Sequence, residues 1–401
     1  MELISVEKIR TARETLHGVV RRTPLRYSGV LQQHCGIPIH LKCENLQRTG
    51  SFKIRGAYVR IHALSSAQRT RGVVAASAGN HGQGVALAAA MLGTTATIYM
   101  PVTVALPKLA ATRDYGAQVH LVGDVVEESL AAARTFSQET GAVFIHPFDH
   151  PDVLAGQGTV GLEVLEQLPD VGTVLVPTGG GGLVGGIAAA VKGVKPKVKV
   201  IGVQAEGAAV WPASLAAGVP IQLRRRHTMA DGISVAELGP VSFAHVSGLV
   251  DEVLTVGEEA LSQALLLCLE RVKMLVEPAG AAAVAALLEP TVRFPGPVCA
   301  VLSGGNVDPL LLMHVIRHGL SAGGRFLTLQ VTMPDRPGEL AELLMRVGES
   351  GANVVDVAHS RIAGSLAVDE AVVALSLETR GPLHRDVLVA DLSAAGYQVT
   401  R

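Results

Sequence analysis

Short apolar runs alternate with helix-patterned stretches along most of this chain, and that alternation restricts the folds open to it. Gly72–Ala76, Thr95–Met100 and Gln118–Val122 have the apolar character of buried strands, and an alanine-rich helix is expected over Gly82–Leu92. A helix that carries the chain back to a new strand is the βαβ pattern of a parallel sheet. The sequence therefore predicts a doubly wound α/β lobe over about residues 45–150.

The same alternation resumes further along the chain and predicts a second, larger α/β lobe. Its expected elements are strand Thr173–Pro177, helix Leu183–Lys192, strand Val198–Val203, helices Val256–Val272 and Ala279–Leu288, and strand Val298–Leu302. We expect the first lobe to be nested within the second, so that residues 1–320 form one two-lobed domain.

The last part of the chain has a different pattern. Ser321–Gly324 follows a helical stretch and has the small residues of a hinge. Beyond it, the predicted elements are strand Phe326–Met333, helix Gly338–Ser350, strands Asn353–Ile362 and Ala371–Thr379, helix Arg385–Ala395 and strand Tyr397–Thr400. This βαββαβ order is that of the ferredoxin-like α+β fold, so residues 326–401 are expected to form a second domain.

Composition excludes several classes of partner. The 401 residues include 34 Lys and Arg against 35 Asp and Glu, which creates no field that would attract nucleic acid or an anionic membrane. The longest apolar run, Ala279–Leu288, is far shorter than the ~20 residues of a membrane helix. Four cysteines without a CxxC pair favour reduced thiols. We therefore expect a cytoplasmic enzyme that binds neither nucleic acid nor a membrane.

Lys53 is the first candidate for a chemical role. It lies between Phe52 and Ile54 at the start of a predicted helix that follows a glycine turn. Removal of water from a lysine amine lowers its pKa and makes Schiff-base chemistry possible. The alternative is a solvated lysine on an exposed helix face, which is the commoner situation for a single lysine. A P-loop is excluded, because the Gly-Lys-Ser/Thr frame is missing.

Three strand-to-helix turns are candidate binding sites. The turn Ser77–Gly82 presents unpaired N–H groups at a helix N-terminus, which suits a carboxylate, although an ordinary N-cap turn has the same residues. Four consecutive glycines, Gly179–Gly182, let the backbone wrap an anion closely, and phosphate is the expected ligand. Ser303 follows a strand at the end where α/β ligands gather.

Taken together, these motifs are similar to those of one known family. SFKIRGA, SAGNHGQGVA, PTGGGGLVGG, EPAGA and SGGN, in this order, resemble the tryptophan-synthase-β-like (fold type II) pyridoxal 5'-phosphate (PLP) enzymes, and most of all the threonine dehydratases (threonine ammonia-lyases). The resemblance covers about residues 5–320 and implies that residues 1–320 are the catalytic domain. Residues 326–401 resemble an ACT regulatory domain, with Asp335-Arg336-Pro337-Gly338 between the first strand and helix.

The resemblance implies a role for each motif. Lys53 would bind PLP covalently with Phe52 beside the ring, while Asn80 and Ser303 would bind the ring oxygen and the pyridine nitrogen. The remaining contacts would come from Gly179, Gly180, Gly181, Gly182 and the Leu183 N–H to the phosphate, and from Ser77, Ala78, Gly79, Asn80 and His81 to the substrate carboxylate.

The resemblance also implies a reaction. Lys53, once displaced by the substrate amine, would remove the Cα proton of L-threonine, and 2-oxobutanoate and ammonia would be the products. The leaving β-hydroxyl would take its proton from the cofactor phosphate, since the motifs are expected to supply no acidic side chain. Ala78 occupies the position where similar serine racemases have a second serine. Those racemases also bind a divalent cation through acidic residues, and in the corresponding stretch of this chain, Gln204–Trp211, the sequence has one acidic residue, Glu206. Both differences favour a dehydratase.

Two alternatives remain open at this point. One is a dehydratase that prefers L-serine. The other is a nicotinamide-dependent dehydrogenase, because Gly180, Gly182 and Gly185 also satisfy GxGxxG and Glu206 lies near the position of a ribose-binding acid.

The sequence also predicts the metal content, the oligomeric state and the regulation of the protein. No metal is expected, since His314 and His318 lack the glutamate of an HExxH site. We predict a homodimer or homotetramer in isoleucine biosynthesis, with isoleucine as allosteric effector. The resemblance to ACT domains implies that the effector would bind at a junction between protomers, near Asp335, Arg336, Pro337, Gly338 and Asn353. The alternative for residues 326–401 is a purely structural dimerisation domain.

Overall fold

A computed structural model describes residues 2–289, 293–361 and 367–400. The chain forms two compact units, Met1–Pro309 and Leu310–Arg401, and each is described by itself. All four cysteines are free thiols. Within the described ranges, the helices are too short or too polar to cross a membrane.

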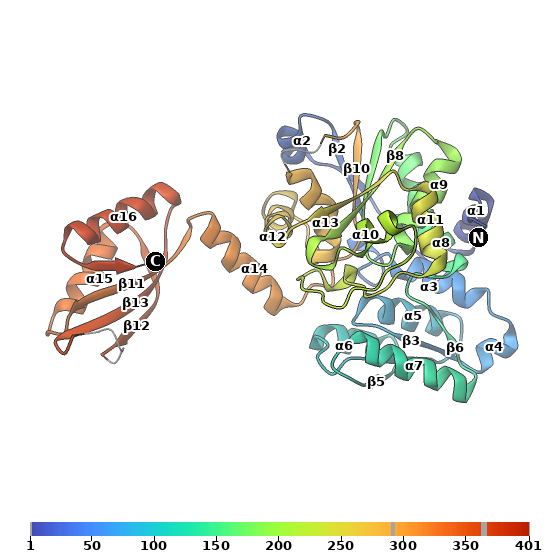
Figure 1. Ribbon diagram of the computed structural model, residues 1–401, viewed down its shortest axis with the longest axis horizontal. Coiled ribbons are helices and arrows are strands. Elements are labelled where there is room, and N and C mark those ends of the chain that lie inside the picture. The colour runs from blue at the N-terminus through green and yellow to red at the C-terminus, as the bar shows by residue number, and fades with distance from the viewer. Residues whose placement is uncertain (1, 290–292, 362–366, 401) are drawn as a thin grey trace. The chain divides into compact units, whose positions relative to one another are not determined.

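The larger lobe of the first unit is built on a six-stranded sheet of order β1-β2-β10-β7-β8-β9 (Figure 1). Only β1 and β2 run antiparallel; all other neighbours are parallel. The strands are β1 Leu25–Tyr27, β2 Ile39–Cys43, β7 Thr173–Pro177, β8 Lys199–Ala205, β9 Glu252–Val256 and β10 Val298–Leu302. The predicted bounds of β7 and β10 are confirmed.

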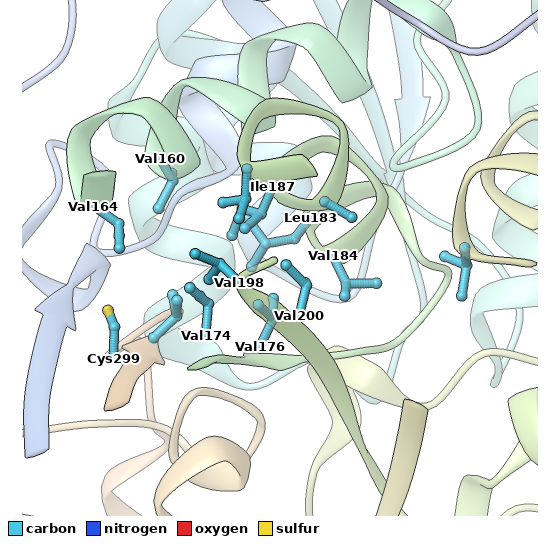
Figure 2. Close-up of a cluster of buried hydrophobic side chains, with 14 of the residues drawn as sticks. Val160, Val164, Val174, Val176, Leu183, Val184, Ile187, Val198, Val200 and Cys299 are labelled. Carbon is cyan, nitrogen blue, oxygen red and sulfur yellow. The ribbon is translucent and has the colours of Figure 1, made fainter. Parts of the chain in front are cut away.

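Helices surround this sheet. They are α1 Val6–Thr15, α2 Gly29–Cys35, α3 Lys53–His62, α8 Pro151–Gln167, α9 Gly182–Val194, α10 Val210–Ala217, α11 Pro240–Leu249, α12 Glu258–Leu267 and α13 Pro278–Leu288, with short turns η1 Glu44–Leu46, η2 Glu206–Ala208 and η3 Asp231–Ile233. Figure 2 shows how α8 and α9 cover β7 and β8 with branched aliphatic side chains, among them Val160, Ile187, Val174 and Val200. Strands buried on both faces explain the near-continuous apolar runs in the sequence.

The smaller lobe is a four-stranded parallel sheet of order β5-β4-β3-β6. Its strands are β3 Val73–Ala76, β4 Ala96–Met100, β5 Gln118–Leu121 and β6 Val143–Phe144, and its helices are α4 Ser66–Thr70, α5 Asn80–Met91, α6 Leu106–Asp114 and α7 Val126–Thr140. All of these elements lie between β2 and β7 in the sequence. The smaller lobe is therefore inserted between two strands of the larger sheet along the chain.

One predicted element of the first unit differs from the structure. The helix expected over Val256–Val272 begins only at Glu258, because the residues before it form β9 at the edge of the larger sheet. The end of the predicted helix is a wider π-helical turn, η4 Cys268–Val272. This turn ends at Lys273, which adopts a left-handed conformation with φ of 61°.

The second unit has a four-stranded antiparallel sheet of order β12-β13-β11-β14. Its elements are α14 Pro309–Ala322, β11 Phe326–Pro334, α15 Glu339–Glu349, β12 Asn353–Ser360, β13 Glu370–Glu378, α16 Pro382–Ala394 and β14 Gln398–Thr400. Alternate residues of β11 and β13, such as Leu329 and Leu375, are buried in a core shared with Leu343 and Leu388 of α15 and α16.

The hinge and one strand end of this unit were expected at other places than the structure shows or describes. Ser321 of the expected hinge belongs to α14, and the turn that follows is formed by residues 323–325. Ile362, the expected end of the strand that begins at Asn353, lies outside the described residues.

Candidate active site

Lys53 is the first residue of α3, and its side chain is half-buried. The Lys53 Nζ donates a hydrogen bond of 2.9 Å to the Pro147 carbonyl and lies 5.3 Å from the centroid of the Phe52 ring. Burial of the amine outweighs the attraction of the Glu277 carboxylate and lowers the pKa of Lys53 from 10.5 to about 8. Lys53 is therefore not the solvated lysine of the alternative interpretation.

The turn Ser77–His81 leads from β3 into α5 at the carboxyl end of the smaller sheet, and Asn80 and His81 are the first residues of that helix. The Gly79 N–H donates to Ser77 Oγ at 2.9 Å, while the N–H groups of Ala78, Asn80 and His81 find no acceptor among the described residues. The His81 ring contacts the Ile145 carbonyl at 2.8 Å, and burial lowers the pKa of His81 to about 3, so this imidazole is neutral. The turn thus presents unpaired N–H groups, as expected of a carboxylate site.

The glycine loop follows β7 and leads into α9. No N–H group of residues 179–183 finds a hydrogen-bond acceptor among the described residues, so five donors converge at the start of a helix. A Cβ at Gly180 would lie 2.4 Å from the Phe148 ring, and Gly181 has a φ of +91°. Glycine is therefore required here by close approach and by backbone conformation, and the exposed donors suit a phosphate.

Short connections bring these motifs together around Lys53. Pro147, which accepts from the Lys53 amine, precedes the Phe148 ring that packs against the glycine loop. On the other side, the Phe52 N–H donates to the Ser303 carbonyl at 3.2 Å. Ser303 is buried, and its hydroxyl makes no hydrogen bond within the described part of the chain. Lys53, the glycine loop and Ser303 consequently share one site.

Glu277 is a residue of this site that the sequence analysis missed. Its carboxylate is buried, and Oε1 accepts a hydrogen bond of 2.6 Å from Asn80 Nδ2. Burial raises the pKa of Glu277 from 4.5 to about 7. The expectation that these motifs supply no acidic side chain is therefore wrong. The signal was present: EPAGA places one carboxylate at the start of an otherwise apolar helix.

The structure separates the residues expected to bind an effector. Asp335–Gly338 connects β11 to α15, and Asp335 Oδ2 accepts a hydrogen bond of 2.7 Å from Arg361 Nε, just beyond the end of β12. Asn353 begins β12 and pairs with Glu378 of β13, and Glu378 also pairs with Phe326, the first residue of β11. Asn353 therefore lies at the end of the sheet where β11 begins, whereas Asp335 follows the other end of β11. Because α15 carries the chain back to the end where β11 begins, Asn353 does not join the Asp335–Gly338 loop within one chain.

Comparisons with known proteins identify the family of this chain. The family model "Pyridoxal-phosphate dependent enzyme" matches residues 16–304. The chain belongs to this family. It is 48% identical to an L-threonine ammonia-lyase of Thermotoga maritima over 99% of both chains, and 46% identical to another of Geobacter sulfurreducens over 98% of both.

Solved structures give the same relationship over 76–80% of the chain. A threonine deaminase from T.th. has a TM-score of 0.73 and 43% identity, covering 76% of this chain and 99% of that one. Maize serine racemase has a TM-score of 0.74 and 35% identity, covering 80% and 99%. The family match decides against the nicotinamide alternative, and the exposed Glu206 follows β8 outside the cluster described above.

The residues present fit PLP as a cofactor. A buried amine, five free N–H groups at a helix N-terminus, and an unpaired serine hydroxyl are the functional groups that a cofactor with an aldehyde, a phosphate and a ring nitrogen requires. Asn80 adds an amide whose nitrogen makes one hydrogen bond with the described residues, to Glu277. Lys53, residues 179–183, Ser303 and Asn80 would therefore hold the group.

Proposed function

We propose that this protein is a threonine dehydratase, which converts L-threonine to 2-oxobutanoate and ammonia. The observation that carries the proposal is the buried Lys53 amine among the motifs of a PLP-dependent family. Threonine is favoured as substrate because the full-length relatives, at 46–48% identity, are named L-threonine ammonia-lyase. L-Serine, which also carries a β-hydroxyl, is the second expected substrate.

Bound PLP supplies the electron withdrawal that weakens the substrate's Cα–H bond. The N–H groups of the Ser77–His81 turn bind the substrate carboxylate and thereby set which face of Cα is presented. Lys53 accepts the Cα proton at Nζ, and its pKa of about 8 leaves a useful fraction of neutral amine near neutral pH. Loss of the β-hydroxyl as water, followed by uptake of water, yields the oxo acid and ammonia.

The polarity of the cofactor site favours elimination. Ser303 offers a neutral hydroxyl to the pyridine nitrogen, whereas a carboxylate there would keep that nitrogen protonated. Electron withdrawal by the pyridine ring should therefore be moderate. Moderate withdrawal favours rapid loss of the β-substituent and disfavours a long-lived negative charge on the ring.

The test is the Lys53→Ala variant, with Lys197→Ala as a surface control. Wild-type protein should carry a visible chromophore that borohydride bleaches, and should form 2-oxobutanoate from L-threonine. Lys53→Ala should lose at least about a thousandfold in turnover, because covalent binding and proton transfer are both removed. A turnover within about tenfold of wild type would exclude the assigned role.

We further propose that the second unit is an ACT-type regulatory domain that responds to isoleucine, in a cytoplasmic homodimer or homotetramer serving isoleucine biosynthesis. Support comes from its βαββαβ order with an antiparallel sheet and from relatives that match the chain over nearly its whole length. The loop Asp335–Gly338 and its partner Arg361 are the proposed effector contacts.

A further inference from the structure

Glu277 has the geometry of a residue that organises the site. We propose that Glu277 is a positioning residue, which fixes the Asn80 side-chain amide together with Asn306 and places an ionisable carboxylate beside Lys53. The inference rests on the proposed PLP-dependent function. It adds a residue and a role that none of the sequence motifs assigned.

The amide of Asn80 is held from both ends. Asn80 Nδ2 donates to Glu277 Oε1 at 2.6 Å, and Asn80 Oδ1 accepts from Asn306 Nδ2 at 2.8 Å. Asn306 is itself anchored, because the same nitrogen donates to the Thr49 carbonyl at 2.7 Å. A reversed amide would set its oxygen against the carboxylate and its nitrogen against another NH₂ group. The orientation of Asn80 is therefore determined by charge and hydrogen bonding.

The Glu277 side chain binds Asn80 and does not cap its own helix, α13. Glu277 occupies the N-cap position of α13, yet its side chain makes no capping hydrogen bond. It is 2% exposed, and Oε2 has no partner among the described residues. A Cβ at Gly304 would lie 2.1 Å from Oε1, so the neighbouring turn leaves room for this carboxylate only because residue 304 is glycine. A buried carboxylate oxygen without a partner is costly, and such costs concentrate at functional sites.

Several charged groups face the carboxylate. Lys53 of α3 and Lys108 of α6 favour its ionised form, as does the hydrogen bond from Asn80 of α5. Asp231 of η3, which pairs with Lys108 at 2.7 Å, opposes ionisation together with burial. The balance raises the pKa of Glu277 to about 7, so its charge changes within the neutral range. A charge that appears or disappears beside Lys53 must alter the proton affinity of whatever Lys53 holds.

The experiment is a pH titration of the visible absorbance of the full-length holoenzyme without substrate. Glu277→Gln keeps an oxygen that can accept from Asn80 but removes the charge. Glu258→Gln is the matched control, because Glu258 also has one oxygen bonded to an N–H, that of Met229, and one without a partner. We expect the spectral midpoint to move by at least about half a pH unit in Glu277→Gln and to stay in place in Glu258→Gln.

Two further variants separate position from charge. Glu277→Ala should weaken PLP binding by about tenfold, whereas Glu277→Gln should retain it within about threefold, since the acceptor remains. If Glu277→Ala does not fold, Glu277→Asp serves, because it keeps the charge and shortens the reach to Asn80. In an Asn80→Ala background, the Ala substitution should have no additional effect on PLP binding.

The proposal is overturned if Glu277→Gln and the control have the same spectral midpoint as wild type, or if the effects of Glu277→Ala and Asn80→Ala are additive. Failure of the proposed function has a different signature. In that case the wild-type protein itself would bind no borohydride-sensitive chromophore, and no titration could be recorded.

Discussion

At the scale of single residues, the site is governed by withdrawal from water. Burial lowers the pKa of Lys53 to about 8 and raises the pKa of Glu277 to about 7, although each group attracts the charged form of the other. Desolvation therefore outweighs the mutual attraction at both residues. The consequence is an acid and a base that both exchange protons near neutral pH, which is where a proton-transfer catalyst works best.

The raised pKa of Glu277 predicts a pH-dependent stability difference. Between pH 4.5 and about 7, the folded protein retains a proton on Glu277 that the unfolded chain has released. This contribution to the free energy of unfolding is fully present below pH 4.5 and is lost as the pH rises through about 7. The Glu277→Gln variant lacks the titration, so its melting temperature relative to wild type should be higher at pH 8 than at pH 5. An unchanged difference across this range would contradict the shifted pKa.

Ala78 predicts the stereochemical outcome with serine. A methyl group cannot donate or accept a proton on the face of Cα opposite Lys53. With L-serine as substrate, we expect D-serine to form at less than about a tenth of the rate of pyruvate, measured by chiral chromatography after partial turnover. Ala78→Ser is the informative companion, because it restores a hydroxyl at this position. Comparable rates of racemisation and elimination in wild type would reveal a second base.

The places of the candidate residues in the fold were predictable from the sequence where they depend on local structure. Lys53, the Ser77–His81 turn and the glycine loop each lie at a junction between two elements, and such junctions are visible in a short stretch of sequence. The contact of Glu277 with Asn80 was not predictable in this way, because the two residues are 197 positions apart in the chain. Only the folded arrangement of the two lobes reveals that contact.

At the scale of elements, α3 is anchored by a buried network of charges beneath Lys53. Arg55 is fully buried and pairs with Glu44 at 2.8 Å and Glu163 at 2.7 Å, while Lys42 donates to the same Glu163 at 2.5 Å. The carboxylates hold the pKa of Arg55 above its usual range. These ion pairs hold α3, the helix that carries Lys53, against η1 and α8. They thereby fix the position of the Lys53 backbone.

We predict that Arg55→Met destabilises the protein strongly. Removal of the guanidinium leaves Glu44 without its ion-pair partner and Glu163 paired with Lys42 alone. Breaking a buried ion pair costs about 3–5 kcal/mol. The matched control is Arg13→Met, because Arg13 pairs with Glu166 at the surface and should contribute less than about 1 kcal/mol. Chemical denaturation monitored by circular dichroism gives both values. Equal effects would mean that the buried network has no special part in stability.

Element predictions succeeded where the hydrophobic pattern was unambiguous. The fully buried strands β7 and β10 were located to the residue. The edge strand β9 was missed, because exposed polar residues such as Glu252 and Thr255 interrupt its apolar pattern. The separation of Asn353 from the Asp335–Gly338 loop within one chain was not visible in the sequence: the order of elements was correct, but only the pairing of strands determines which strand ends lie together.

At the scale of the whole molecule, two units of different architecture share one chain. The family model ends at residue 304, close to the boundary at Pro309, whereas the full-length relatives continue to the end. The motifs of the site all lie before that boundary. None of the groups described for the site comes from the second unit, which is what the regulatory role proposed for it requires.

The last prediction tests that role. Isoleucine should shift threonine saturation to higher concentration or make it sigmoidal, with a coupling free energy of about 1–3 kcal/mol. Truncation after Pro309 should leave turnover within about threefold of wild type and abolish the response, since no residue of the described site is removed. In the full chain, Asp335→Ala should weaken the response without loss of basal activity, because its pair with the exposed Arg361 contributes little to stability. A truncated protein that folds, turns over threonine and remains equally sensitive to isoleucine would instead place the effector site among the lobes of the first unit.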